Sequence, residues 1–265
     1  MRHFAASGSV PPSAKQLFQR GAKKMDSHSR STEFLDAFAS IEKHLRKISQ
    51  SSKDTSIPQM IASLKREKSF SEIRAVENDL RELADLRNAI VHERGEGAIL
   101  AVPNETAVDL IKSTLKRIAQ PAKIFPYFRR QGIETFLATQ AIGDLVESIY
   151  QNSYSQFPIY DNKGFVDLLT SNTVARWLGS VAKNDLVSLN DTTIEQVLEC
   201  TENRDHVKFM SRECSVFEAI ELFNDHEGKG TRLEAILISQ NGIESEKIIG
   251  MIAYSDMPQL IELSK

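Results

Sequence analysis

The sequence predicts a mixed fold, α plus α/β, in which a bundle of helices precedes an α/β region made of two related repeats. Apolar residues recur every three or four positions from residue 31 to residue 121, which is the period of helices that face a core. After Pro121, short apolar runs alternate with turn signals, as in α/β or α+β proteins. The pattern helix, strand, turn, strand, helix occurs twice in that second region, which indicates a structural repeat.

The composition is that of an ordinary globular protein. Of the 265 residues, 41% are hydrophobic and 26% are charged, which excludes collagen-like and wholly disordered classes. No apolar run approaches the roughly 18 residues of a membrane-spanning helix, so we expect no membrane partner. The two cysteines, Cys200 and Cys214, are too few for a disulfide framework, which favours a reducing compartment and a cytoplasmic location.

Residues 1–30 are expected to form a flexible basic tail. They contain six basic residues and one acidic residue among Gly, Pro and Ser, without the apolar core of a secretion signal. The biological start can be Met1 or Met25. Basic tails are usually solvated, but they can also contact phosphates. Residues 121–265 hold thirteen basic and twenty-one acidic residues, which argues against a general nucleic-acid-binding face there.

Residues 31–121 are predicted to form four amphipathic helices of an up-and-down bundle. The first helix has Thr32 as its N-cap, the third begins near Ser71, and the fourth follows Pro103 with Asn104 as its N-cap. The four apolar stripes are, in order, Phe34, Phe38, Ile41, Leu45 and Ile48; Ile57, Met60, Ile61 and Leu64; Ile73, Val76, Leu80 and Leu83; and Val108, Ile111, Leu115 and Ile118. No strand pattern interrupts them.

Residues 122–265 are predicted to contain the two repeats, at about 125–182 and 200–265. A helix is expected after Thr170 in the first repeat and near Ser255 in the second. Strands are expected at residues 157–160, 165–169, 235–238 and 248–252. Ser215 followed by Glu218 predicts a capping box at the first helix of the second repeat. Trp177, on an apolar helical stripe, is expected to be a core residue.

The two repeats resemble tandem CBS domains, which pack together in the Bateman arrangement. The resemblance rests on the segments FPIYDNKGFVDLLTSNTVARW and AILISQNGIESEKIIGMIAYSDM. It implies two βαββα-type CBS repeats with clefts for an adenine nucleotide, which acts as a regulatory ligand and not as a required cofactor. AMP, ADP, ATP, a cyclic dinucleotide and S-adenosylmethionine all carry the adenosyl group that such clefts recognise.

The resemblance also implies which residues bind this ligand. Asp256 stands where the family places its ribose-binding carboxylate, and Thr173 stands at the same position of the first repeat. Thr170 keeps a hydroxyl that the second repeat lacks at Ala253. The predicted ligand-binding residues are Asp256, Ser255, Tyr254, Thr170, Thr173, Pro158 and Ile159. Two alternatives remain open, because Asp256 can stabilise the dipole of its helix and the last two residues can be core residues.

The third predicted helix ends in DLRELADLRNAIVHER, which places Arg87 on the apolar stripe. Because a lone guanidinium is costly to bury, Arg87 has to be paired, lie at an interface or face a ligand. The segment resembles the HEPN superfamily, whose nuclease members carry Arg, a polar residue, three further residues and His. Arg87, Asn88 and His92 match this motif. The resemblance implies a HEPN-like bundle, a homodimer that brings two motifs together, and metal-independent cleavage of single-stranded RNA.

In such a nuclease, His92 takes the proton of a ribose 2′-hydroxyl, Arg87 stabilises the charge on the phosphorane, and Asn88 orients the phosphate or His92. Two alternatives remain open: His92 can be a helix C-terminal histidine, and Arg87 can pair with Asp79, Glu82 or Asp85. The sequence has no phosphate-binding loop and no His/Cys cluster at zinc spacing, so we expect no metal site.

Together, the two regions predict an adenine-nucleotide-sensing protein that controls an N-terminal HEPN domain with ribonuclease activity. The alternative is a non-catalytic scaffold that senses a ligand or dimerises.

Overall fold

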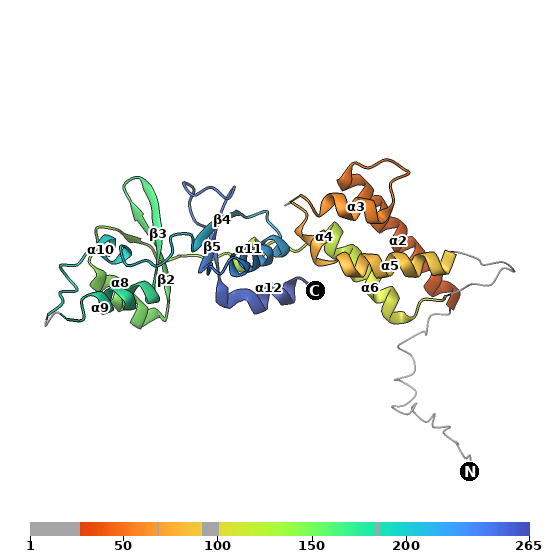
Figure 1. Ribbon diagram of the computed structural model, residues 1–265. Coiled ribbons are helices and arrows are strands. Elements are labelled where there is room, and N and C mark those ends of the chain that lie inside the picture. The colour runs from red at the N-terminus through yellow and green to blue at the C-terminus, as the bar shows by residue number, and fades with distance from the viewer. Residues whose placement is uncertain (1–26, 68, 92–100, 184–185) are drawn as a thin grey trace, which may run out of the picture. The chain divides into compact units, whose positions relative to one another are not determined.

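The computed structural model describes residues 27–67, 69–91, 101–183 and 186–265 (Figure 1). These residues fall into two compact units, which do not follow the order of the chain. The first contains the described residues of Met1–Ile57 and Asn78–Leu115, and the second contains those of Pro58–Glu77 and Lys116–Lys265. No helix in the described ranges has the length and apolar character needed to cross a membrane.

The first unit is helical. It holds α2 (Ser27–Ser49), nearly all of α5 (Glu77–Val91) and most of α6 (Glu105–Ala119). Most residues of the predicted stripes are buried, namely Phe34, Phe38, Ile41 and Leu45 of α2, Leu80 and Leu83 of α5, and Val108, Ile111 and Ile118 of α6. The apolar period of 3.6 residues therefore located these helices correctly.

The predicted helix boundaries are partly correct. Asn104 caps α6, because its Oδ1 accepts the Ala107 N–H at 2.8 Å. Thr32 is not an N-cap: α2 begins at Ser27, and the Thr32 hydroxyl donates to the His28 carbonyl one turn back, at 3.1 Å. A threonine hydroxyl inside a helix can donate to the carbonyl four residues earlier, as it does here.

The second predicted helix belongs to the second unit except for Ile57, and the third is divided between the two units. The second is α3 (Ile57–Leu64). The third is two helices, α4 (Ser71–Ala75) and α5, because Val76 leaves the helical conformation with φ −111° while its side chain stays buried. In its described residues, the second unit also packs α4 against a helix of the second repeat.

The second unit contains two three-stranded sheets of the same topology. The first sheet consists of β1 (Phe136–Leu137), β2 (Gln156–Asp161) and β3 (Gly164–Thr170), and the second of β4 (Val207–Ser211), β5 (Ala235–Ser239) and β6 (Gly250–Ala253). In each sheet the first strand pairs parallel with the second, which pairs antiparallel with the third. Four strands lie within two residues of their predicted positions. The positions of β1 and β4 were not predicted, since neither shows a clear alternation.

Four helices complete the βαββα repeats: α8 (Ile142–Asn152) and α9 (Ser171–Ser180) in the first, and α11 (Val216–Gly228) and α12 (Met257–Leu263) in the second. Helices α11 and α12 lie side by side (Figure 1). The predicted capping box is confirmed: the Ser215 N–H donates to the Glu218 carboxylate at 2.6 Å, and the Glu218 N–H donates to Ser215 Oγ at 3.3 Å. Trp177 of α9 is buried in the core of the first repeat.

The two repeats exchange short helices. Helix α7 (Phe125–Phe128) precedes the first repeat, but its Phe128 lies in the core of the second. Helix α10 (Ile194–Leu198) precedes the second repeat, and its Leu198 lies in the core of the first. Matching backbone bridges hold both crossings, one between Lys123 and Ser215 and one between Ala141 and Thr193. The repeats are therefore interlocked with pseudo-twofold symmetry.

The two sheets also share an apolar interface. Leu168 of β3 and Leu237 of β5 are fully buried in one cluster. Phe165 and Phe209 meet edge to face in the same cluster, with ring centroids 5.1 Å apart. This interface sets the two sheets against each other, so that the ends of their strands border shared clefts.

Candidate functional site

Strand register defines which residues of the two repeats are equivalent. Thr170 pairs with Gln156 in the first sheet, and Ala253 pairs with Ala235 in the second. Three residues after each of these positions come Thr173 and Asp256. The predicted equivalence of Thr173 with Asp256 therefore agrees with the register.

One cleft collects four of the predicted ligand-binding residues. Thr170, Thr173, Tyr254 and Ser255 line a cavity of about 820 Å³, which we call cleft A. Thr170 and Thr173 end β3 and begin α9, whereas the other two residues follow β6, so the cleft uses both repeats. Its volume lies within the range of about 300–1,000 Å³ that is typical of small-molecule sites.

The two threonines of cleft A are bonded to each other. Thr170 caps α9 by accepting the Thr173 N–H at 3.2 Å, and the two hydroxyl oxygens are 3.1 Å apart. Both side chains are buried. They therefore shape the wall at the start of α9.

Other polar groups of cleft A supply charge and an aromatic surface. Arg232 Nε lies 3.1 Å from Glu234 Oε1, and the Arg232 guanidinium carbon lies 5.7 Å from the centroid of the Tyr254 ring. The carbonyl of Glu234 accepts the Gln156 side-chain amide at 3.0 Å, which links the two repeats. His206 is buried, with Nε2 3.0 Å from the Leu168 carbonyl. The cleft therefore offers a cation, a carboxylate and a partly exposed aromatic ring.

Asp256 lies beside a second cleft, because its interaction partners line that cleft. Its Oδ2 accepts the Ala253 N–H at 2.8 Å and lies 3.6 Å from Nη2 of Arg130. Arg130, Ala253 and Ser255 line a cavity of about 190 Å³, which we call cleft B. Among the described residues, Oδ1 of Asp256 has no hydrogen-bond partner. Asp256 thus holds the turn before α12 and retains one free oxygen beside cleft B.

The remaining two predicted residues are buried in β2. Pro158 and Ile159 pair with residues of β3, and Ile159 is fully buried in the core of the first repeat. Neither residue lines cleft A or cleft B. The structure thus places them in the sheet, in line with the core alternative.

The predicted nuclease motif lies at the end of α5. Arg87 is half-buried and Asn88 is exposed. Among the described residues, the Arg87 side chain donates to Asn88 Oδ1 at 3.4 Å and forms no ion pair. His92 lies outside the described residues.

Several residues of cleft A were missed by the sequence analysis. His206 stands directly before β4, Glu234 stands directly before β5, and Arg232 lies two residues before Glu234. The available signal was their place before an apolar strand, but β4 was itself not recognised. Among the described residues, no group of three or more His, Cys, Asp or Glu could hold a metal ion.

No protein-family model matches the chain, and no curated protein matches it. About half of the chain is similar to solved structures with CBS domains. A CBS domain-containing protein of unknown function from Kribbella flavida is 17% identical, with a TM-score of 0.38 over 51% of this chain and 94% of that one. The CBS-domain protein ATU1752 from Agrobacterium tumefaciens is 16% identical, with a TM-score of 0.36. The similarity covers 50% of this chain and 85% of that one.

A third similar structure contains ligands. It is the CBS domain pair of protein MJ0100 in complex with 5′-methylthioadenosine and S-adenosylmethionine. Its sequence is 13% identical to this chain, and the TM-score is 0.38. The similarity covers 55% of this chain and 99% of the MJ0100 chain. At these identities and TM-scores, the similarities by themselves assign no function to this chain.

Proposed function

We propose that the chain is a regulatory protein in which a CBS pair binds an adenine nucleotide in cleft A. The observation that carries this proposal is the convergence of Thr170, Thr173, Tyr254 and Ser255, from two repeats, on one cavity of about 820 Å³. The assignment to a CBS pair is supported by two interlocked βαββα repeats. In each repeat the first strand pairs parallel with the second, and the second pairs antiparallel with the third.

The chemistry of cleft A suits an adenine nucleotide. Tyr254 is 36% exposed, and its ring can stack on a base. Arg232, whose side chain is 70% exposed, can donate to phosphate oxygens, and the Glu234 carboxylate can accept ribose hydroxyls. The first residues of α9 add the positive end of a helix dipole at the same cavity.

Isothermal titration of the full chain with ATP, AMP and S-adenosylmethionine tests this proposal. Arg232→Ala is expected to weaken ATP binding by about tenfold or more, because one charged hydrogen bond contributes roughly 1.5–3 kcal/mol. Lys229→Ala removes an exposed cation that does not line the cleft and is the matched control. Lack of binding of all three compounds, or equal binding by the Arg232 variant, would contradict the proposal.

The nucleotide affinity of Asp256→Asn, measured in the same titration, shows whether the ligand lies in cleft A or in cleft B. A nucleotide in cleft A keeps its affinity in this variant, because Asp256 lies beside cleft B. Loss of binding in Asp256→Asn together with unchanged binding in Arg232→Ala would assign the adenosyl ligand to cleft B and contradict the assignment to cleft A.

We also propose that the nucleotide controls a metal-independent ribonuclease in the helical region, with Arg87, Asn88 and His92 as its active residues. The supporting observation is that Arg87 is half-buried without a carboxylate partner among the described residues, whereas Asp79, Glu82 and Asp85 were all candidates for such a pair. A guanidinium in that state is available to a phosphate. Two copies of the motif in a homodimer would bind the single-stranded RNA between them.

Cleavage of a generic single-stranded RNA in EDTA tests the nuclease, with and without ATP. The wild type is expected to cleave, and His92→Ala is expected to abolish cleavage without changing the dimer, as judged by light scattering. His44→Ala removes a histidine of α2 and is the control. Absence of cleavage by the wild type, or equal cleavage by His92→Ala, would favour the non-catalytic scaffold.

A further inference from the structure

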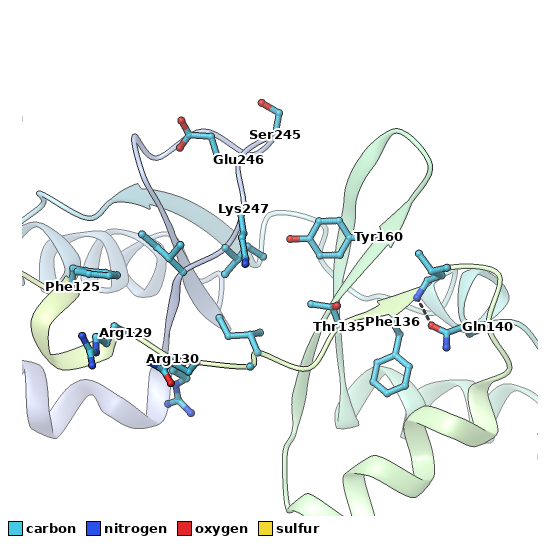
Figure 2. A pocket seen from close by; sticks show the side chains of 16 residues that line it. Phe125, Arg129, Arg130, Thr135, Phe136, Gln140, Tyr160, Ser245, Glu246 and Lys247 are labelled. Atoms are coloured by element: carbon cyan, nitrogen blue, oxygen red, sulfur yellow. Dashed lines mark hydrogen bonds between the residues drawn. The ribbon is translucent and has the colours of Figure 1, made fainter.

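A third cavity of the second unit is rich in cations. It has a volume of about 940 Å³ and is lined by Arg129, Arg130 and Lys247, with Phe125 and Tyr160 on opposite sides (Figure 2). None of the seven residues predicted to bind an adenosyl ligand lines it. The cavity shares the segment 130–133 with cleft B but no residue with cleft A.

The segment that carries the two arginines is fixed to the second sheet. Arg129 forms a backbone bridge to Gly250, and the Arg130 N–H donates to the Ile249 carbonyl at 3.2 Å. Gly250 permits this approach, because a Cβ there would lie 2.6 Å from the Phe128 carbonyl oxygen. The arginines are therefore held at the cavity wall by backbone contacts, while their side chains stay exposed.

Cations outnumber carboxylates in the lining of the cavity. Its one acidic lining residue is Glu246, whose carboxylate accepts hydrogen bonds from the Asn241 N–H at 2.7 Å and from the Asn241 side-chain amide at 2.6 Å. Arg130 pairs with Asp256, but Arg129 and Lys247 form no ion pair among the described residues. Two cations are thus left to a ligand.

The pseudo-symmetry of the repeats indicates that the fold does not require a cation at position 129. Arg129 is the C-cap of α7, and the C-cap of the equivalent helix α10 is Glu199. The backbone tolerates either charge at this position. Residues 121–265 carry more acidic than basic residues, so a cluster of cations in one cavity stands out against its surroundings.

The walls of the cavity add an apolar surface and a donor. Tyr160 is half-buried, and burial raises the pKa of its hydroxyl, which therefore stays protonated and can donate a hydrogen bond. Figure 2 shows this hydroxyl on the side of the ring that faces Lys247. Phe125 lies on the other side, near Arg129.

We propose that this cavity is a separate binding site for a small molecule that carries two or more phosphate groups. The phosphates contact Arg129 and Lys247, and the organic part lies against Tyr160 and Phe125. Each charged hydrogen bond to a phosphate is about twice as strong as a neutral one, and guanidinium matches phosphate geometry. The proposal does not depend on the function of cleft A.

Isothermal titration of the full chain with inorganic tripolyphosphate tests the site. The wild type is expected to bind, and Arg129→Glu, which installs the residue of α10, is expected to weaken binding by at least about tenfold. Lys163→Glu makes the same charge change in the hairpin between β2 and β3, which is equivalent to the hairpin that carries Lys247. Lys163 does not line the cavity, so this variant is expected to keep the wild-type affinity within about twofold. Orthophosphate is expected to bind much more weakly than tripolyphosphate.

No binding of tripolyphosphate by the wild type, or equal weakening by Arg129→Glu and Lys163→Glu, would overturn the proposal. The affinity for AMP, measured in the same variants, distinguishes this site from cleft A. Arg129→Glu is expected to leave the affinity for AMP unchanged, because Arg129 does not line cleft A. Thermal unfolding checks that Arg129→Glu keeps the fold, as its exposed side chain predicts.

Discussion

Arg74 of α4 and Glu221 of α11 form a two-point ion pair, in which Nε of Arg74 donates to Oε1 of Glu221 and Nη2 donates to Oε2. The two residues are 147 positions apart in the chain. Arg74 Nη1 also donates to the Glu67 carbonyl. One guanidinium thus ties the segment before α5 to the second repeat.

This ion pair is expected to stabilise the second unit. Arg74→Ala and Glu221→Ala should each lower the free energy of unfolding by about 1–2 kcal/mol. This is less than the loss of a fully buried pair would cost, because both side chains are partly exposed. Urea denaturation of both single variants and the double variant measures the coupling. Lys265→Ala breaks an exposed pair with Glu262 and should change the stability by less than about 0.5 kcal/mol. A coupling indistinguishable from zero would refute a stabilising role.

Glu72 of α4 is expected to make stability depend on pH. Burial, and then the charge of Glu218, raise the pKa of Glu72, whereas Arg74 and Lys123 act in the opposite direction. Because the folded-state pKa lies above the unfolded value, the protonated form is favoured by folding. The contribution of protonated Glu72 to the free energy of unfolding is complete below pH 4.5 and is lost as the pH rises through the folded-state pKa.

Glu72→Gln tests this pH dependence, since it mimics the protonated side chain. The variant should be more stable than the wild type at pH 7 and equally stable near pH 4, as measured by urea denaturation across that range. A variant that is less stable than the wild type at pH 7 would show that the carboxylate stabilises the fold there.

Gly250 is expected to tolerate no side chain. Gly250→Ala would bring a Cβ to 2.6 Å from the backbone oxygen of Phe128, which cannot move without shifting α7. The free energy of unfolding should fall by about 2 kcal/mol or more. Gly179→Ala in α9 meets no atom within 4 Å and should be neutral or stabilising by about 0.5–1 kcal/mol. Thermal unfolding of both variants is the measurement, and equal effects would argue against the close approach at Gly250.

The helix exchange is expected to contribute strongly to stability. Phe128→Ala should lower the free energy of unfolding by about 3–5 kcal/mol, because the ring is 3% exposed in the core of the second repeat. Tyr127→Ala truncates the neighbouring ring, which is 50% exposed, and should have a much smaller effect. Similar losses in the two variants would indicate that α7 does not seal that core.

Local sequence signals predicted most elements of the fold. The capping box at Ser215, the start of α9 after Thr170 and the hairpin strands around Gly164 depend on residues within a few positions of one another. Predictions failed where packing decided the outcome. Val76 interrupts a helix whose apolar stripe continues unbroken, and Thr32 bonds within α2 instead of capping it.

The candidate sites were predicted only in part. Thr170 and Thr173 were predicted from positions that the resemblance to CBS domains marks, and both residues line cleft A. Pro158 and Ile159 come from the same repeat pattern but lie within the first sheet. An alternation of apolar residues shows that a strand is buried, yet it does not show which of its buried residues reach a cleft.

The two repeats and the helices before them can be recognised along the chain, together with the residue types at the ends of β3 and β6. Periodicity and capping act over a few residues, so they are local signals. The exchange of α7 and α10 between the repeats depends on packing, as do the lining of one cleft by Arg232 and Tyr254 and the lining of another by Arg129 and Lys247. These relationships join residues far apart in the chain, and they arise from the packing of two sheets, which no local pattern encodes.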